Sequence, residues 1–251
     1  MWKFVIFLFV GVGAQSNINW CNMKTQYCRG LDHIACEPNN FPYATGVRNI
    51  QIVPMTDAIK TAIVDRHNFY RSRIAKAGES GVPGAAKMEK MVWNNDLAYV
   101  AEQHAKHANF QHDDCRSFTT FPNSGQNLAS GSSSAPFSSL VDNIQTHIDL
   151  WYGEVAAIKD KLKCIDSFTL TDNCLDAGHF TVMVKDVNNA VGCSAVTFEQ
   201  QYGTRWFYSL LTTCNYADTN VINQRIYNTG TSCSACASVK KSCESSSGLC
   251  V

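Results

Sequence analysis

Apolar side chains recur at three- and four-residue steps in three segments near the middle of the chain, a spacing that predicts amphipathic helices. The first helix is expected to begin after the capping residue Thr56 and to end at Gly78. The second should begin after Asn94 or Asn95, and the third should cover about residues 139–158. The three apolar stripes, which would face a common core, contain the following residues: Ile59, Ile63, His67, Tyr70 and Ile74; Leu97, Val100, Ala101, His104, Ala105 and Ala108; Leu140, Ile144, Ile148, Trp151 and Val155.

In the last third of the chain the pattern changes to short runs rich in β-branched and aromatic residues. We interpret residues 179–184, 191–198 and 205–213 as strands. Asn188-Asn189 between the first two runs predicts a hairpin turn. Because helices come first and strands come late, the pattern predicts an α+β fold built from packed layers.

The two ends of the chain lack this periodicity. Residues 15–54 are rich in Asn, Pro and Gly and predict an irregular arm, and the Ser- and Gly-rich stretch over 130–139 predicts a flexible loop. We therefore divide the chain into a leader over 1–14, the arm, a folded domain over 55–217 and a cysteine-rich extension over 218–251.

The leader has the features of a secretory signal peptide. An apolar run over residues 4–12 follows Lys3, and Val12 and Ala14 stand at the −3 and −1 positions of an expected cleavage site before Gln15. The run is too short to cross a bilayer, and no later segment is long and apolar enough to do so. We therefore expect a secreted, extracellular protein with no transmembrane segment.

Composition supports this compartment and excludes some partners. All twelve cysteines follow the expected cleavage site, and an even number in a secretory chain predicts a disulfide framework. A zinc site is the alternative for Cys233 and Cys236, which have the spacing of a ligand pair. The 21 basic and 21 acidic residues balance, so no charge field directs the protein to nucleic acid.

A series of short blocks resembles the CAP superfamily, which comprises antigen 5, cysteine-rich secretory and pathogenesis-related-1 proteins. The similarity covers about residues 56–217 and is nearest to the antigen 5 proteins of insect saliva and venom. It implies a three-layer α-β-α sandwich, in agreement with the periodicity. The blocks that carry it are Arg66-His67-Asn68, Val92-Trp93-Asn94, His112-Asp113-Asp114-Cys115, Gly125-Gln126-Asn127, Trp151-Tyr152-Gly153-Glu154, Gly178-His179-Phe180-Thr181, Cys193 and Cys214-Asn215-Tyr216.

The resemblance also implies a set of disulfides. Three pairs follow from the family, Cys164 and Cys174 then remain as a local pair, and the last four cysteines should pair among themselves in one of three ways. The expected pairs are Cys21–Cys36, Cys28–Cys115, Cys193–Cys214 and Cys164–Cys174, with Cys233, Cys236, Cys243 and Cys250 left open.

The family gathers two histidines and two glutamates at one cleft, and the resemblance places that set at His112, Gln126, Glu154 and His179. The two imidazoles would suit a divalent transition metal, copper or zinc. Glu154 could orient one histidine or act as a base for bound water. Gln126 replaces a family glutamate, and its amide cannot act as a base or supply a negative charge.

We expect a monomeric, non-enzymatic effector of saliva or venom that acts by binding a small lipid, a divalent metal or a host protein of haemostasis or immunity. No arrangement of nucleophile, base and orienting residue is legible in the chain, and no Gly-x-Ser-x-Gly motif is present. The enzymatic alternative is a copper-dependent redox activity at His112 and His179, such as the removal of superoxide.

A third hypothesis concerns Arg29-Gly30-Leu31-Asp32 in the arm. Some relatives in blood-feeding flies carry Arg-Gly-Asp in this loop, which makes an integrin ligand conceivable. Here Leu31 displaces the carboxylate of Asp32 by up to about 3.5 Å relative to Arg29. The alternative interpretation is a solvated turn held by neighbouring disulfides.

Overall fold

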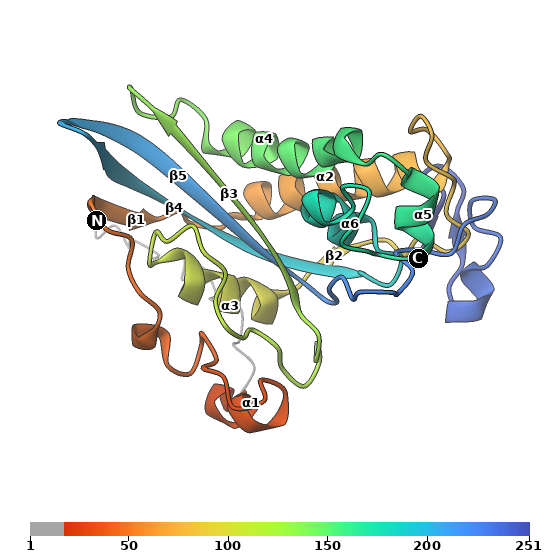
Figure 1. The fold of residues 1–251 in the computed structure, drawn as a ribbon, viewed down its shortest axis with the longest axis horizontal. Coiled ribbons are helices and arrows are strands. Elements are labelled where there is room, and N and C mark those ends of the chain that lie inside the picture. The colour runs from red at the N-terminus through yellow and green to blue at the C-terminus, as the bar shows by residue number, and fades with distance from the viewer. Residues whose placement is uncertain (1–17) are drawn as a thin grey trace, which may run out of the picture.

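The computed structural model describes residues 18–251, in which helices cover both faces of a β-sheet (Figure 1). The predicted leader over 1–14 lies outside the described residues. Within the described part of the chain, no helix combines the length and the apolar character that crossing a bilayer requires.

The sheet has the strand order β1-β4-β5-β3. These strands are β1 (Val47–Ile52), β3 (Gly125–Ser133), β4 (Ala190–Tyr202) and β5 (Arg205–Tyr216), and all three neighbouring pairs are antiparallel. The short strand β2 (Val92–Trp93) pairs in parallel with the start of β4. The hairpin formed by β4 and β5 therefore occupies the centre of the sheet.

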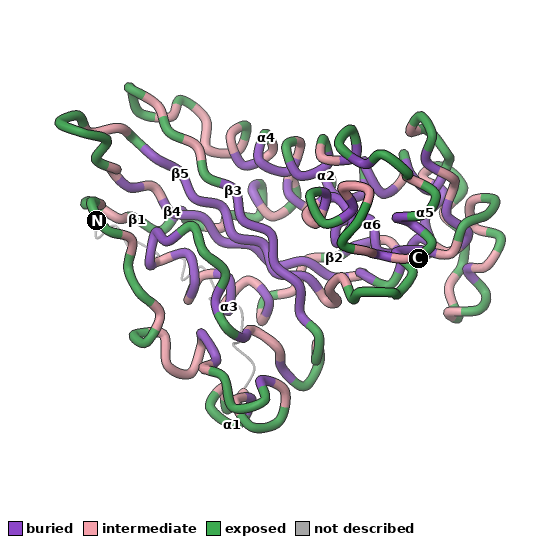
Figure 2. The backbone as a smooth tube through the Cα atoms, viewed as in Figure 1, coloured by how far each residue is buried: buried purple, intermediate pink, exposed green. Residues whose placement is uncertain are grey.

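One face of the sheet is covered by α2 (Asp57–Ala75), α4 (Leu140–Gly153) and α6 (Gly178–Val184), and the other by α3 (Asn95–Ala105) (Figure 1). This is the expected three-layer α-β-α sandwich. Figure 2 shows that burial is concentrated on the central strands and on the inner faces of these helices. The remaining elements are α1 (Trp20–Gln26), α5 (Lys161–Asp166), β6 (Cys243–Glu244), β7 (Leu249–Cys250) and the 3-10 turns Pro38–Asn40, Glu154–Ala157, Leu175–Ala177 and Cys236–Val239.

The long helices each begin after a polar capping residue. The side chains of Thr56, Asn94 and Ser139 each accept a hydrogen bond from a backbone N–H in the first turn of α2, α3 and α4. At Gly192 on β4 the start of α3 comes very close, because a Cβ there would lie 2.2 Å from the backbone nitrogen of Ala98. Only glycine permits this contact between the helix and the sheet.

The strand predicted over 179–184 is wrong, because this segment forms helix α6. Glu154 accepts hydrogen bonds from the backbone N–H groups of His179 and Phe180, which caps the start of the helix from a distant part of the chain. The residues from Phe180 to Val184 are all buried. A short segment buried on every side shows no amphipathic period, so its β-branched composition misled the prediction.

Two predicted connections also differ from the structure. Asn188-Asn189 is not a hairpin turn; the side chain of Asn188 instead bridges the carbonyl of Val182 and the backbone of Asp218. The true hairpin joins Tyr202 to Arg205 through two residues, where Gly203 has a φ of +61°.

The loop predicted over 130–139 is too long, because residues 130–133 belong to β3 and pair with β5. The arm is also more regular than its composition indicates. It contains α1, and its end forms β1, which pairs with β4. Backbone pairing with a neighbouring strand supplies order that a loop-like composition does not reveal.

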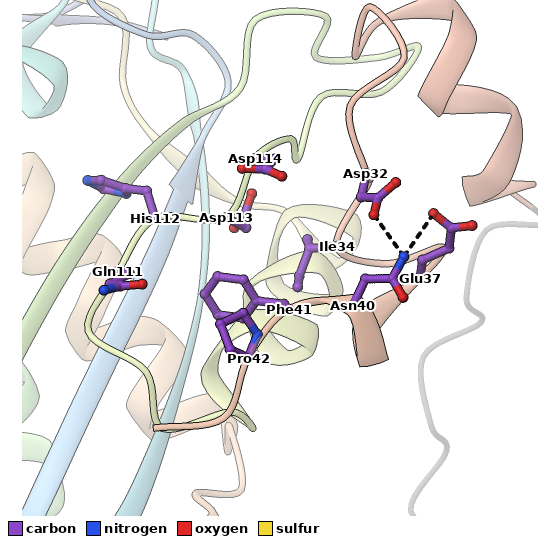
Figure 3. Close-up of a pocket in the computed structure, with 10 residues that line it drawn as sticks. All are labelled: Asp32, Ile34, Glu37, Asn40, Phe41, Pro42, Gln111, His112, Asp113 and Asp114. Atoms are coloured by element: carbon purple, nitrogen blue, oxygen red, sulfur yellow. Dashed lines mark hydrogen bonds between the residues drawn. The ribbon is translucent and has the colours of Figure 1, made fainter. Parts of the chain in front are cut away.

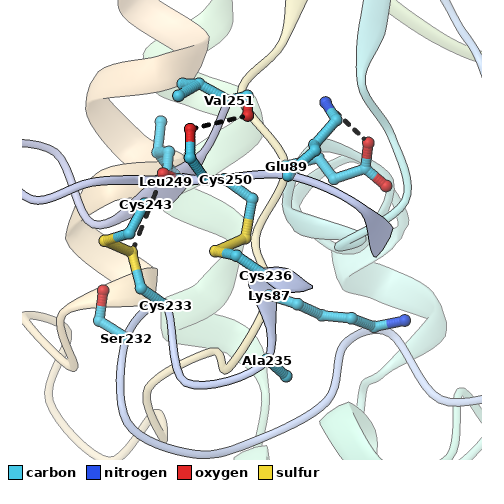
Figure 4. The surroundings of a disulfide bond; sticks show 12 residues. Lys87, Glu89, Ser232, Cys233, Ala235, Cys236, Cys243, Leu249, Cys250 and Val251 are labelled. Carbon is cyan, nitrogen blue, oxygen red and sulfur yellow. Dashed lines mark hydrogen bonds and ion pairs between the residues drawn. A yellow bond between two sulfur atoms is a disulfide. The ribbon is translucent and has the colours of Figure 1, made fainter. Parts of the chain in front are cut away.

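Six disulfides join the twelve cysteines, and none of the described cysteines is free. Three pairs are those that the family resemblance implied, and Cys164–Cys174 is the local pair expected from the remaining cysteines. The pair Cys193–Cys214 joins directly opposite positions of β4 and β5. The last four cysteines, whose pairing the sequence left open, tie the extension to itself (Figure 4). The pairs are Cys21–Cys36, Cys28–Cys115, Cys164–Cys174, Cys193–Cys214, Cys233–Cys243 and Cys236–Cys250.

Arg71, which lies fully buried on α2, connects this helix with two segments outside it. Its guanidinium donates five hydrogen bonds of 2.6–3.2 Å to backbone carbonyl oxygens. The acceptors are Glu89, just before β2, and Met183, Lys185 and Asp186, at the end of α6. Burial lowers the pKa of Arg71 to about 10, so the side chain remains charged at neutral pH.

Candidate functional site

Five of the seven histidines are buried in the packed interior, and the other two line one cleft. His67 illustrates the structural role, because its ring nitrogens bond to the carbonyl of Ile63 and to the hydroxyl of Tyr216. Loss of hydration lowers the pKa of four of the buried imidazoles to about 4, so they are neutral at neutral pH. These four are His33, His67, His107 and His147.

The four cleft residues expected from the family resemblance come together from separate elements. His112 lies on the loop after α3, Gln126 on β3, Glu154 directly after α4, and His179 in the first turn of α6. All four line a cleft of about 360 Å³. Asn127, Phe168, Leu175, Asp176, Gly178, Val182, Thr219 and Asn220 complete its walls.

Glu154 holds His179 in one orientation. Its Oε1 lies 2.5 Å from Nδ1 of His179, and its Oε2 accepts the backbone N–H groups of His179 and Phe180 at 3.0 and 3.2 Å. Trp151, which lies one helical turn before Glu154, stacks on the imidazole of His179 with ring centroids 6.2 Å apart. Both oxygens of Glu154 therefore accept hydrogen bonds that orient His179 and the start of α6.

Gln126 holds His112 in the corresponding way. Its amide oxygen lies 2.7 Å from Nδ1 of His112. Its amide nitrogen donates to Oδ2 of Asp113 at 2.7 Å and to Oδ1 of Asn215 at 3.1 Å. Asp113 in turn forms an ion pair with Arg116, whose Nε lies 3.0 Å from Oδ1.

These contacts determine the tautomer of both imidazoles. A carboxylate oxygen and an amide oxygen can only accept, so each facing Nδ1 must carry the hydrogen. The Nε2 atom of a neutral His112 or His179 then bears a lone pair and can bind a ligand. Burial, above all, lowers the pKa of His112, and nearby Arg116 and His179 lower it further, which keeps the imidazole neutral at neutral pH.

The donor set fits a divalent metal bound through two imidazole nitrogens. Each histidine has a side-chain oxygen behind its Nδ1, which is the usual outer-shell arrangement around metal-binding histidines. Among residues 18–251 there is no group of three or more His, Cys, Asp or Glu side chains that could enclose an ion. A metal in this cleft would therefore keep open coordination positions.

The arm loop that contains Arg29, Gly30 and Asp32 lies outside the cleft. The carboxylate of Asp32 accepts from Lys24 at 2.5 Å and from Asn40 at 2.7 Å, and these hydrogen bonds lower the pKa of Asp32 to about 2. Arg29 adopts a left-handed backbone with a φ of 54°. The acidic group that an integrin ligand would present is thus already bonded within the arm.

A smaller hollow of about 180 Å³ separates the arm from the loop that carries His112 (Figure 3). Asp32, Glu37, Asp113 and Asp114 contribute its acidic side chains. His112 lines this hollow as well as the cleft, so the arm packs directly behind one of the two candidate ligands.

Sequence reasoning gave no role to Asp113 or Asn215, although both occur in the blocks that carry the family resemblance. Asn215 is the direct cross-strand neighbour of Gln126, and Asp113 is the residue after His112. The register of β3 against β5 brings their oxygens to the amide of Gln126. No local signal in the sequence reveals such a contact.

Comparison with known proteins agrees with the residue blocks. A model of the cysteine-rich secretory protein family, CAP, matches residues 64–216. Venom allergen-1 of Aedes albopictus is 36% identical over 87% of this chain and 82% of its own length. Venom allergen 3 of Solenopsis invicta is 34% identical over 83% of this chain and 88% of its own length.

Solved structures show the same fold at lower identity. BmVAL-1 superimposes with a TM-score of 0.64 at 21% identity and covers 84% of this chain and 98% of its own. NaASP2, solved with Zn2+, has a TM-score of 0.58 at 22% identity and covers 84% of this chain and all of its own.

Proposed function

The chain belongs to the cysteine-rich secretory protein (CAP) family, and on this basis we propose that it is a secreted antigen 5-like protein that acts by binding. We propose further that the cleft binds a divalent transition metal, zinc or copper, through Nε2 of His112 and of His179. The observation that carries this proposal is the pair of side-chain oxygens that hold Nδ1–H on both imidazoles, which leaves both Nε2 atoms as acceptors.

Three features favour binding over catalysis. Glu154 uses both oxygens on His179 and the start of α6, and Gln126 has no ionisable group. All described cysteines are in disulfides, which removes thiol nucleophiles. Secretion is supported by these disulfides and by the names of the insect relatives, which are venom allergens.

Calorimetric titration of the metal-free protein with zinc and with copper tests the proposal. We expect saturable binding near one equivalent, weakened at least about tenfold by His112→Ala and by His179→Ala, because each substitution removes one imidazole ligand. Gln111→Ala is the matched control, since it changes the residue beside His112 without touching the cleft, and it should leave binding unchanged. Equal binding by all variants would refute the cleft as the metal site.

The redox alternative depends on the same two imidazoles. Superoxide removal by the copper-loaded protein can therefore be measured on the titrated samples. We expect none, because the proposed role is binding.

A second candidate function is the binding of a small apolar molecule. A hollow of about 280 Å³ lies beside the start of α4, and Phe137, Leu140, Phe198 and Tyr208 contribute most of its apolar wall. Concave apolar surfaces of this kind are typical of small-molecule sites. The hollow is distinct from the cleft, because the two share no residue.

A fluorescent fatty acid can probe this hollow. We expect Leu140→Asp to weaken its binding at least about tenfold, since the substitution places a charge in the apolar wall. Leu150→Asp, on the exposed side of the same helix, is the matched control and should have no effect. If both variants bind the probe like the unmodified protein, the hollow is not the site.

A further inference from the structure

We infer that Asp113 is a positioning residue that allows a glutamine to serve at position 126. By accepting from the amide nitrogen, it orients Gln126 so that the amide oxygen faces His112. That orientation holds His112 in the Nδ1–H tautomer, with Nε2 available to a ligand. The ligand itself rests on the proposed function, whereas the tautomer is a property of the metal-free protein.

An amide has two orientations that differ by the exchange of its oxygen and nitrogen. If Gln126 were reversed, its nitrogen would donate to Nδ1 of His112, and the hydrogen of the neutral ring would move to Nε2. The lone pair on Nε2 would be lost. A glutamine at this position therefore positions His112 for binding in only one of its two orientations.

Asp113 and Asn215 select that orientation. The nitrogen side of the amide faces Oδ2 of Asp113 at 2.7 Å and Oδ1 of Asn215 at 3.1 Å, and a carboxylate oxygen cannot donate. Reversing Gln126 would place its oxygen against these two acceptors and would exchange a charge-assisted hydrogen bond for a repulsive contact. Of the two, the carboxylate is the stronger acceptor.

Asp113 is itself fixed in place. Its side chain is only 2% exposed and pairs with Arg116, whose Nη2 also donates to the backbone carbonyl of Asp113 at 2.6 Å. Two residues further on, Cys115 forms a disulfide with Cys28 of the arm, and the backbone carbonyl of Cys115 accepts the N–H of Ile34 at 3.0 Å. The arm thus anchors the segment that carries both His112 and Asp113 (Figure 3).

Position 154, which carries the other side chain that orients a cleft histidine, could not use a glutamine in the same way. The Oε2 atom of Glu154 faces two backbone N–H donors, so an amide nitrogen there would meet donors instead of acceptors. At position 126 an amide can keep the Nδ1–H tautomer of His112, because acceptors lie behind its nitrogen. At position 154 the backbone donors would take the amide oxygen, so the amide nitrogen would face Nδ1 of His179 and the ring hydrogen would move to Nε2. Conversely, a glutamate at 126 would set its carboxylate against that of Asp113.

The test exchanges the acid and the amide. In Asp113→Asn, Arg116 should still bind the side-chain oxygen of the new asparagine. The amide nitrogen of this asparagine then faces the amide nitrogen of Gln126, and the contact between two donors favours the reversed orientation of Gln126. In the double variant Asp113→Asn with Gln126→Glu, the asparagine nitrogen donates to the new glutamate, whose other oxygen accepts Nδ1–H of His112. Asp114→Asn is the matched control, because this exposed neighbour lines the arm hollow and not the cleft.

The first readout is the ¹⁵N NMR signature of the His112 ring in the metal-free protein at neutral pH, which distinguishes a protonated from an unprotonated Nε2. We expect an unprotonated Nε2 in the unmodified protein and a larger population with protonated Nε2 in Asp113→Asn. In the double variant, Nε2 should again be mainly unprotonated. Zinc affinity should follow, with a loss of about tenfold in the single variant.

Two outcomes would overturn the inference. One is an unchanged His112 tautomer in Asp113→Asn, and the other is a double variant no better than the single one. The double variant restores the hydrogen bonds from residue 126 to residue 113 and to His112, although not the one to Asn215. Its recovery therefore separates positioning by residue 113 from a general loss of folding in the single variant. If the unmodified protein shows the expected tautomer yet binds no zinc, the proposed function fails while the positioning role of Asp113 stands.

Discussion

Replacing Arg71 with methionine is expected to lower the free energy of unfolding by about 4 kcal/mol, the largest effect of any single substitution considered for this protein. The substitution leaves the carbonyl groups of Glu89, Met183, Lys185 and Asp186 in the interior without their donor. Methionine fills a similar volume, so the loss would reflect missing hydrogen bonds more than a cavity.

Denaturation in guanidinium chloride with the disulfides intact, followed by tryptophan fluorescence, measures this effect. The matched control is Arg73→Met on the same helix, because Arg73 is half exposed and pairs with Glu79 at the surface. We expect the control to cost less than about 1 kcal/mol. Equal losses in the two variants would show that the buried network does not hold α2 to the end of α6.

Acid should destabilise the protein well above the range in which carboxylates titrate. Burial lowers the pKa of His33, His67 and His147 to about 4, whereas a histidine in the unfolded chain titrates near 6.5. Between these values the unfolded chain binds more protons than the folded one, so stability falls as the pH falls from about 6.5 to 4. Each histidine should contribute a loss on the order of 2 kcal/mol by pH 4.5.

Calorimetric melting between pH 7 and pH 4.5 checks this expectation. His147→Asn is the informative variant, since a neutral amide can keep the contact with the hydroxyl of Thr212 but cannot titrate. Its melting temperature should depend less steeply on pH than that of the unmodified protein. A melting temperature that stays constant from pH 6.5 to 4.5 would contradict the prediction.

The sequence predicted the parts of the fold that local chemistry decides. Thr56 was predicted as a cap, Asn94 was one of two candidates, and the third helix was expected from about residue 139, because a polar side chain next to an amphipathic run is a local signal. Helix α6 was missed because its start is capped by Glu154, 25 residues away, and its other residues are buried on all sides. Strand β1 was missed for a related reason, since its order comes from pairing with β4.

For the candidate site too, one part could be predicted from the sequence and another part required the structure. His112, Gln126, Glu154 and His179 could be named only because the family resemblance placed them together, and the structure shows that they line one cleft. Their hydrogen-bond partners depend on strand register and on a segment held to the arm. Composition and spacing carry no information about which oxygen will face the nitrogen of an amide, so the role of Asp113 required the structure.

The strand order has a consequence for biosynthesis. The edge strands β1 and β3 are made early and do not pair with each other. Each pairs instead with a strand of the β4–β5 hairpin, which is made after both of them. Until residues 190–216 have left the ribosome, both early strands have unpaired edges. Sheet assembly must therefore wait for nearly the whole chain, during which the nascent protein exposes strand-forming segments to its surroundings.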